Sequence, residues 1–226
     1  MRIGIIGSGN IGKALARYLV NLGHEVMIAN SRGPETLGTI ASETGATPAT
    51  AEEAAGAKDL VIISIPEKAI MDLPKGLFSS SKAVIVDTGN YYPSRDGRIA
   101  DIDDGVRDSE WVAQVIGHPV VKAFNNIYAA SLASKAAPAD SPNRIALSVA
   151  GDDDHDKQMI MELIDQIGFD AIDGGPLSES WRQQPGTPAY CQDLGKEALA
   201  SALQKAELSE RAANLAQADE QARPYF

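Results

Sequence analysis

A glycine-rich turn stands between an apolar run and a helical pattern near the N-terminus. It reads Gly7-Ser8-Gly9-Asn10-Ile11-Gly12, and Ile11, Leu15 and Leu19 then recur at the spacing of one helix face. In such a turn the first glycine bends the chain, the second admits a phosphate and the third packs helix on strand. The helix N-terminus adds free N–H groups and a positive dipole end. The turn therefore predicts a dinucleotide site.

Strand and helix patterns alternate along the rest of the chain. Continuous apolar runs such as 60–65 and 84–87 are typical of parallel strands that are buried on both faces. Strands are expected at 2–6, 25–30, 60–65, 84–87 and 120–124, and helices at 10–22, 34–44 and 51–57. The alternation predicts an α/β fold, a doubly wound and mostly parallel Rossmann sheet.

A smaller unit is expected after the prolines at 138 and 142. A strand pattern at 144–149, a helix at 152–167 and a strand at 169–172 precede C-terminal helices. We expect a dinucleotide-binding Rossmann domain at 1–137 and a small αβ extension at 138–226. The two could equally count as one domain, because no flexible linker separates them.

Charge and cysteine content disfavour several classes of protein. The net charge is −11, which argues against nucleic acid and anionic membrane surfaces as partners. No apolar run approaches the length of a membrane span, and the first strand leaves no room for a signal peptide. A single cysteine excludes an internal disulfide framework. These features predict a cytoplasmic protein.

Asn30-Ser31-Arg32 ends the second strand, where NAD sites usually carry an acidic residue. A carboxylate there would repel a 2′-phosphate, whereas a serine hydroxyl and an arginine fork would bind one. Asn30 can still bond a ribose oxygen. The segment predicts NADP, although a solvated Arg32 on a surface turn is the alternative.

Further cofactor contacts are expected beyond the carboxyl ends of the later strands, where open parallel sheets bind ligands. The candidate residues are Ser64, Ile65, Pro66, Gly89, Asn90 and Ala123. The aspartate-rich stretch 90–108, which contains Tyr91 and Tyr92, is expected to be a long polar loop. It would form either a wall of the substrate site or a solvated connection.

Several motifs together resemble one known family, and they occur in the family's order over nearly the whole chain. They are the segments 2–12, 30–32, 120–126, 150–153 and 174–180. The chain resembles the NADPH-dependent oxidoreductases related to the deazaflavin (coenzyme F-420):NADP oxidoreductases. The resemblance implies that NADP lies along the strand ends and passes hydride to a planar acceptor stacked over the nicotinamide. It also implies a homodimer.

The chain departs from that family after Ser178. The segment 181–191 is polar and aromatic, and only Thr187-Pro188 matches the family. It could form a different acceptor pocket, for which the candidates are Asn125, Trp181, Arg182 and Tyr190. Coenzyme F-420 is the leading acceptor, and a flavin, a quinone or a small carbonyl or imine compound remains open. A non-catalytic NADP(H)-binding regulator is the alternative from another class.

No catalytic residue is assigned, because hydride transfer between planar rings needs positioning more than acid–base chemistry. A carbonyl substrate would need a proton donor, and Lys122, His118 and Tyr128 are the nearest candidates. The acidic run 152–156 is expected to cap a helix rather than bind metal. Cys191 is expected to be a packing residue.

Overall fold

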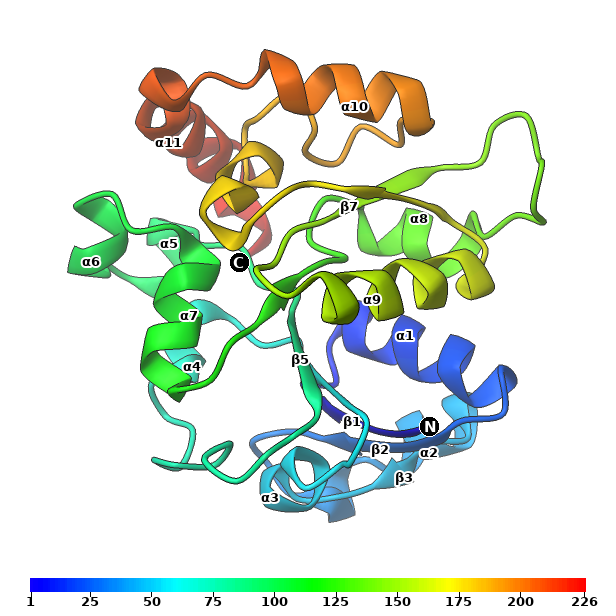
Figure 1. The fold of residues 1–226 in the computed structure, drawn as a ribbon. Helices are drawn as coiled ribbons and strands as arrows, with labels where there is room; N and C mark the ends of the chain where they lie inside the picture. Colours follow the sequence, from blue (N-terminus) through cyan, green and yellow to red (C-terminus); the bar gives the residue numbers. More distant parts are fainter.

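The computed structural model describes residues 1–226, and six of its strands form one parallel sheet (Figure 1). The strands are β1 (Arg2–Ile6), β2 (Glu25–Ala29), β3 (Thr47–Pro48), β4 (Leu60–Ile63), β5 (Val84–Asp87) and β6 (Val121–Lys122). Their order is β3-β2-β1-β4-β5-β6, so the order of strands reverses between β1 and β4. This is the Rossmann arrangement, which confirms the predicted fold class.

Helices cover both faces of this sheet. The helices of the whole chain are α1 (Asn10–Asn21), α2 (Gly38–Thr44), α3 (Ala51–Ala55), α4 (Glu67–Ile70), α5 (Pro93–Asp96), α6 (Ala100–Asp103), α7 (Asp108–Ile116), α8 (Ala129–Ser134), α9 (Asp154–Ile167), α10 (Lys196–Lys205) and α11 (Arg211–Ala222), of which α10 and α11 pack on the C-terminal part and on α5 instead of this sheet. Successive strand residues point to opposite faces, so Leu60 and Ile62 join one apolar cluster while Val61 and Ile63 join the other. The predicted continuous apolar runs follow from this double burial.

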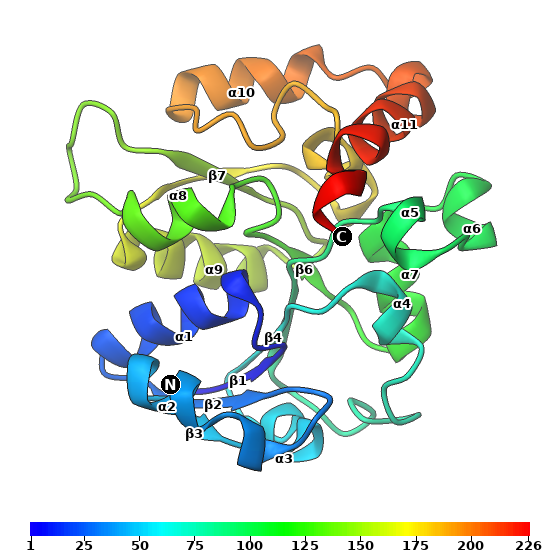
Figure 2. The ribbon, with the colours of Figure 1, turned by 180° about the vertical axis from the view of Figure 1, so that it is seen from behind.

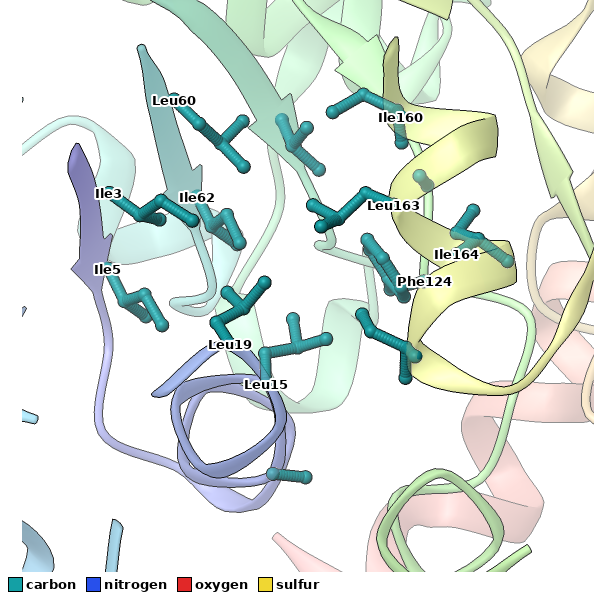
Figure 3. Packing of buried hydrophobic residues seen from close by; sticks show 14 of the residues in the cluster. Ile3, Ile5, Leu15, Leu19, Leu60, Ile62, Phe124, Ile160, Leu163 and Ile164 are labelled. Atoms are coloured by element: carbon teal, nitrogen blue, oxygen red, sulfur yellow. The ribbon is translucent and has the colours of Figure 1, made fainter. Parts of the chain in front are cut away.

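The first cluster joins the two parts of the chain. Leu15 and Leu19 of α1 and Ile160 and Leu163 of α9 belong to the same buried cluster as the β1 and β4 side chains. Figure 3 shows α1 and α9 on one side of these strands with their apolar side chains directed toward them. Residues 138–226 therefore share a hydrophobic core with the Rossmann part.

The C-terminal part adds a second, two-stranded sheet that one isolated bridge links to the first. Strands β7 (Ala146–Val149) and β8 (Asp170–Asp173) form a parallel pair, and an antiparallel bridge connects Lys122 to Ala150. The two hydrogen bonds of this bridge measure 2.7 and 3.0 Å between nitrogen and oxygen. Helix α10 packs on β7, and α11 crosses toward α5, so that the C-terminus lies beside α5 and β6 (Figure 2).

The prediction of a long loop at 90–108 is wrong. This stretch contains the short helices α5 and α6, and its Tyr91 and Asp96 side chains are buried. The Tyr91 side chain is fully buried, and its hydroxyl donates toward Gly97 O and Asp103 Oδ1, both at 3.1 Å. Asp96 accepts from the backbone N–H of Tyr92 at 3.0 Å. Asp96 therefore binds a donor inside the fold, whereas Asp101, Asp103 and Asp104 remain exposed.

Two smaller boundaries differ from expectation. The helix expected at 34–44 is a 3-10 turn at Pro34–Thr36 followed by α2. Strands β4 and β6 end before 65 and 124, so the strand-end residues begin earlier. None of the helices combines the length and apolar character needed to cross a membrane.

Candidate functional site

The glycine turn between β1 and α1 is as tight as the sequence predicts. Gly7 has a φ of 122°, and a Cβ at this position would lie 2.0 Å from Ser64 O. A Cβ at Gly12 would lie 2.0 Å from Gly7 O. At Gly9 no atom lies within 4 Å of such a Cβ. The fold itself thus requires the first and third glycines, while the second faces open space.

The first turn of α1 presents unpaired backbone donors to that space. Its first helical hydrogen bond runs from Lys13 N to Gly9 O at 2.8 Å, so the N–H groups of the preceding residues have no helical partner. Gly9 provides no side-chain cap, and the first turn holds no acidic residue. This donor set fits the pyrophosphate of a dinucleotide.

The end of β2 is an ordered turn that leaves Arg32 exposed. Asn30 Oδ1 accepts from Arg32 N at 2.9 Å, and Asn30 Nδ2 donates to Thr36 Oγ1 at 2.9 Å. The Arg32 side chain makes no hydrogen bond or ion pair. Ser31 is exposed beside it. The Arg32 guanidinium is therefore unpaired at the end of the second strand, where Rossmann folds in general bind the adenosine ribose.

The remaining strand-end residues differ in what they can offer a cofactor. Ser64, Ile65, Pro66, Gly89 and Asn90 are half-buried. The Ile65 side chain lies against the glycine turn, 3.0 Å from where a Cβ of residue 7 would stand. Ala123 is fully buried, backbone included, so in this structure it exposes no group to a ligand.

Asn125 ties the ends of β5 and β6 to the C-terminal part. Its Nδ2 donates to Asn90 Oδ1 at 3.0 Å and to Gln183 O at 2.8 Å. Its Oδ1 accepts from Gln183 Nε2 at 2.7 Å, and the side chain is buried. Asn125 therefore holds Asn90 in place and has no polar group free for an acceptor.

A buried ion pair lies beneath this edge of the sheet, and sequence reasoning missed it. Lys122 Nζ donates to Asp87 Oδ2 at 3.0 Å and to Gly89 O at 2.6 Å. Ser109 Oγ donates to the same Asp87 oxygen at 2.6 Å. Burial alone would lower the pKa of Lys122, but the carboxylates around it raise that pKa, so the amine stays charged. The sequence did contain a signal for this pair, because Asp87 and Lys122 are charged residues within apolar strand runs.

Glu67 completes the buried cluster. Arg95 Nη2 donates to Glu67 Oε2 at 2.9 Å, whereas Glu67 Oε1 has no partner. Burial, and then the Asp87 charge, raises the pKa of Glu67 well above its ordinary value. The surroundings of Glu67 therefore favour its protonated form more than water does.

The segment 181–191 is divided between the core and the strand ends. Trp181 is 3% exposed, and the Arg182 guanidinium lies 4.5 Å from its ring centroid. Arg182 Nη1 donates to Leu203 O and Ala206 O at 3.2 and 3.1 Å, and thus satisfies carbonyls at the end of α10. The structure therefore gives Trp181 and Arg182 packing and capping contacts. Tyr190, by contrast, meets Tyr92 at the strand ends, with 2.8 Å between their hydroxyl oxygens.

A cavity of about 360 Å³ opens beside this tyrosine pair. Its lining residues are Tyr92, Tyr128, Gly186, Thr187, Tyr190, Gln192, Asn214, Gln217, Ala218, Gln221, Ala222 and Tyr225. Sequence reasoning did not identify the wall that α11 supplies. The sequence signal for this wall was the amide side chains of Asn214, Gln217 and Gln221, whose spacing places them on one helix face.

The other candidate proton donors lie in different surroundings. Lys122 is fully buried in its ion pair, and His118 Nδ1 lies 2.8 Å from Pro119 O. Tyr128 lines the cavity.

No group of three or more His, Cys, Asp or Glu side chains is arranged to hold a metal ion. Asp153 caps α9 by accepting from Asp156 N at 3.0 Å, which confirms the predicted helix cap.

Cys191 is expected to resist alkylation in the folded protein. The thiol is buried, and burial raises its pKa to about 12, so the reactive thiolate is scarce at neutral pH. Iodoacetamide at pH 8 should label the native protein at least tenfold more slowly than the urea-unfolded protein, as intact-mass measurements would show. Equal labelling rates would contradict this packing role.

The fold and the glycine turn together define a Rossmann-type dinucleotide-binding protein. The model of the coenzyme F420-dependent NADP oxidoreductase family matches residues 2–91. The hypothetical protein SMa0349 of Sinorhizobium meliloti is 31% identical, with a TM-score of 0.73, over 87% of this chain and 96% of that one. The chain belongs to the family of NADP-dependent oxidoreductases related to the F420-dependent enzymes.

Two more distant proteins are similar to the chain in fold or in sequence. A candidate F420-dependent NADP-reductase from Arthrobacter sp. FB24 shares the fold at 22% identity and a TM-score of 0.62, over 80% of this chain and 87% of that one. Rat metalloreductase STEAP3 is 28% identical over 180 residues, which are 79% of this chain and 35% of STEAP3. The chain spans less than half of the length of the curated relatives that it matches.

Proposed function

We propose that this protein binds NADPH along the carboxyl ends of β1, β2, β4, β5 and β6 and transfers its hydride to a small-molecule acceptor. The observation that carries this proposal is the first turn of α1. It combines unpaired N–H groups, no acidic side chain and open space at Gly9, and this arrangement fits a pyrophosphate. The family's NADP dependence supports the choice of cofactor.

The residues proposed to hold NADPH fall into three groups. Gly7, Ser8, Gly9, Asn10, Ile11 and Gly12 would bind the pyrophosphate, Asn30, Ser31 and Arg32 the adenosine ribose, and Ser64, Ile65, Pro66, Gly89 and Asn90 the nicotinamide side. The bound cofactor would supply the hydride. The chain's own contribution would be to hold the nicotinamide at the edge where Asn125 fixes Asn90.

The leading acceptor in this proposal is a planar ring such as coenzyme F-420 or a flavin, since the family model describes F420-dependent enzymes. A small carbonyl or imine compound is the second candidate. The cavity beside Tyr92 and Tyr190 favours it, because hydroxyl donors stand at the strand ends where an alkoxide would need a proton. The third alternative is a non-catalytic regulator. Such a protein would bind NADPH but would not oxidise it, whichever acceptor is supplied.

Arg32→Ala is expected to weaken NADPH binding roughly tenfold to a hundredfold and to leave NADH binding unchanged. A charge-assisted hydrogen bond to the 2′-phosphate contributes roughly 1.5–3 kcal/mol, and NADH lacks that phosphate. Fluorescence titration of both cofactors measures the effect. Arg98→Ala is the matched control, because Arg98 lies just before α6 and forms a surface ion pair with Asp103. Native preference for NADH, or unchanged NADPH affinity in the Arg32 variant, would refute the proposal.

A further inference from the structure

The cavity beside Tyr92 and Tyr190 is built from three separate parts of the chain. Tyr92 follows β5, Tyr128 follows β6, and Asn214, Gln217 and Gln221 come from α11. The hydrogen bond from Cys191 N to Asn126 O, at 3.0 Å, places Tyr190 beside the end of β6. The cavity therefore opens at the edge of the sheet where the nicotinamide of a bound NADPH is proposed to lie.

Specific contacts hold α11 as a wall of this cavity. Asp219 Oδ1 accepts from Ser94 N at 2.9 Å and from Ser94 Oγ at 2.7 Å. The backbone of α11 passes so close to Gly186 that a Cβ there would lie 2.2 Å from Asn214 O. Arg211 Nε donates to Gln184 Oε1 at 3.2 Å. The wall is thus fixed by polar contacts that do not involve the amides facing the cavity.

No charged side chain lines the cavity. Its polar groups are tyrosine and threonine hydroxyls and the amides of glutamine and asparagine. The nearby cations bind other groups. Arg95 lies 5.4 Å from the centroid of the Tyr92 ring but does not line the cavity, and its guanidinium binds Glu67, Asp96 and the carbonyl of Asn90. Arg211 binds Val106 O and Asp108. An anionic ligand would find no ionic partner in the cavity, and the chain's net charge of −11 would repel it further.

The Tyr92–Tyr190 pair supplies a directed hydrogen-bond donor. One phenol donates to the other across 2.8 Å, which leaves the second phenol's proton available to a ligand. Burial raises the pKa of Tyr92 to about 12 and raises that of Tyr190 as well, so both phenols stay protonated at neutral pH. Phe226 packs edge-on against the Tyr92 ring with centroids 5.2 Å apart and helps to fix its orientation.

We propose that this cavity takes an uncharged carbonyl compound as the hydride acceptor, with its oxygen bonded to the free hydroxyl of the tyrosine pair. This inference rests on the proposed NADPH-dependent activity. Hydride adds to the carbonyl carbon, and the electron pair of the C=O π bond moves to the oxygen. That oxygen takes the phenolic proton, NADPH becomes NADP⁺, and the tyrosinate recovers a proton from water. The product is an alcohol.

Matched pairs of carbonyl compounds test the charge preference. The probes are para-nitrobenzaldehyde against anionic para-carboxybenzaldehyde, and naphthoquinone against naphthoquinone sulfonate. Binding is measured by equilibrium dialysis on NADP⁺-saturated protein, and kcat/KM by NADPH absorbance loss. We expect the uncharged member of each pair to be favoured at least tenfold in both measurements. Gln217→Arg, at an exposed position of the wall, should reverse part of that preference.

Phenol removal tests the tyrosine pair. Tyr92→Phe and Tyr190→Phe should each lower kcat/KM for the uncharged aldehyde at least tenfold, while NADPH affinity stays within twofold. Tyr18→Phe is the matched control, since Tyr18 does not line the cavity and its hydroxyl donates to Leu132 O. Equal or better use of the anionic probes, unchanged kinetics in both phenylalanine variants, or no binding of any uncharged probe would overturn the inference. If riboflavin alone accepts hydride, only this inference fails; if no acceptor does, the proposed function fails too.

Discussion

Gly9→Ala is expected to weaken NADPH binding at least a hundredfold, about 2.7 kcal/mol, without unfolding the protein. A methyl group there would occupy the space through which the pyrophosphate approaches the N–H groups of α1. The free protein accommodates the same group, because Gly9 has a φ of −70° and no atom lies within 4 Å of the new Cβ. Alanine is a poorer N-cap than glycine, so about 1 kcal/mol of stability is the largest loss expected.

Gly12→Ala provides the contrasting variant. Its new Cβ would lie 2.0 Å from Gly7 O, so the helix must shift away from the turn. Overpacking of this kind costs about 1–3 kcal/mol of stability and should lower the melting temperature. Thermal melts and NADPH titrations of the two variants separate binding from folding. Retained NADPH affinity in a folded Gly9→Ala protein would contradict the proposed pyrophosphate site.

Lys122→Met is expected to lower the free energy of unfolding by about 3–5 kcal/mol. Methionine preserves much of the aliphatic stem, but Asp87 then loses its cationic partner inside the sheet. The hydrogen bond to Gly89 O, which fixes the chain just before Asn90, is lost as well. Urea denaturation monitored by circular dichroism measures the change.

Two further variants define what the Lys122 result means. Lys135→Met removes a pair with Asp193 in which the lysine side chain is 55% exposed, so it should cost less than about 1 kcal/mol. The double variant Lys122→Met with Asp87→Asn removes the uncompensated charge and should recover part of the loss. A loss below 1 kcal/mol in Lys122→Met alone would show that the pair does not stabilise this edge of the sheet.

The Rossmann part could be predicted from the sequence because its signals are local. The glycine turn, the doubly buried apolar runs and the capped helix at 154–167 each depend on neighbouring residues. Even the exposed Arg32 follows from a short turn that Asn30 orders. These features are set by periodicity and turn chemistry, which a single chain displays directly.

The acceptor side could not be predicted in the same way, because it depends on contacts between distant segments. Arg182 was a candidate for the acceptor pocket, yet it binds carbonyls more than twenty residues later at the end of α10. Tyr92 and Tyr190 are 98 residues apart and meet only when α11 and the strand ends are in place. The aspartates of 90–108 suggested solvent, although Asp96 and Asp108 accept hydrogen bonds from buried backbone.

The most direct test of the account is a crystal structure of the protein grown with NADP⁺. We predict that the pyrophosphate lies on the N–H groups of the Gly7–Gly12 turn and that the 2′-phosphate contacts Arg32. The nicotinamide should lie beside Asn90 and face the cavity that Tyr92 and Tyr190 line. A cofactor bound elsewhere, or a nicotinamide ring directed away from that cavity, would contradict the account.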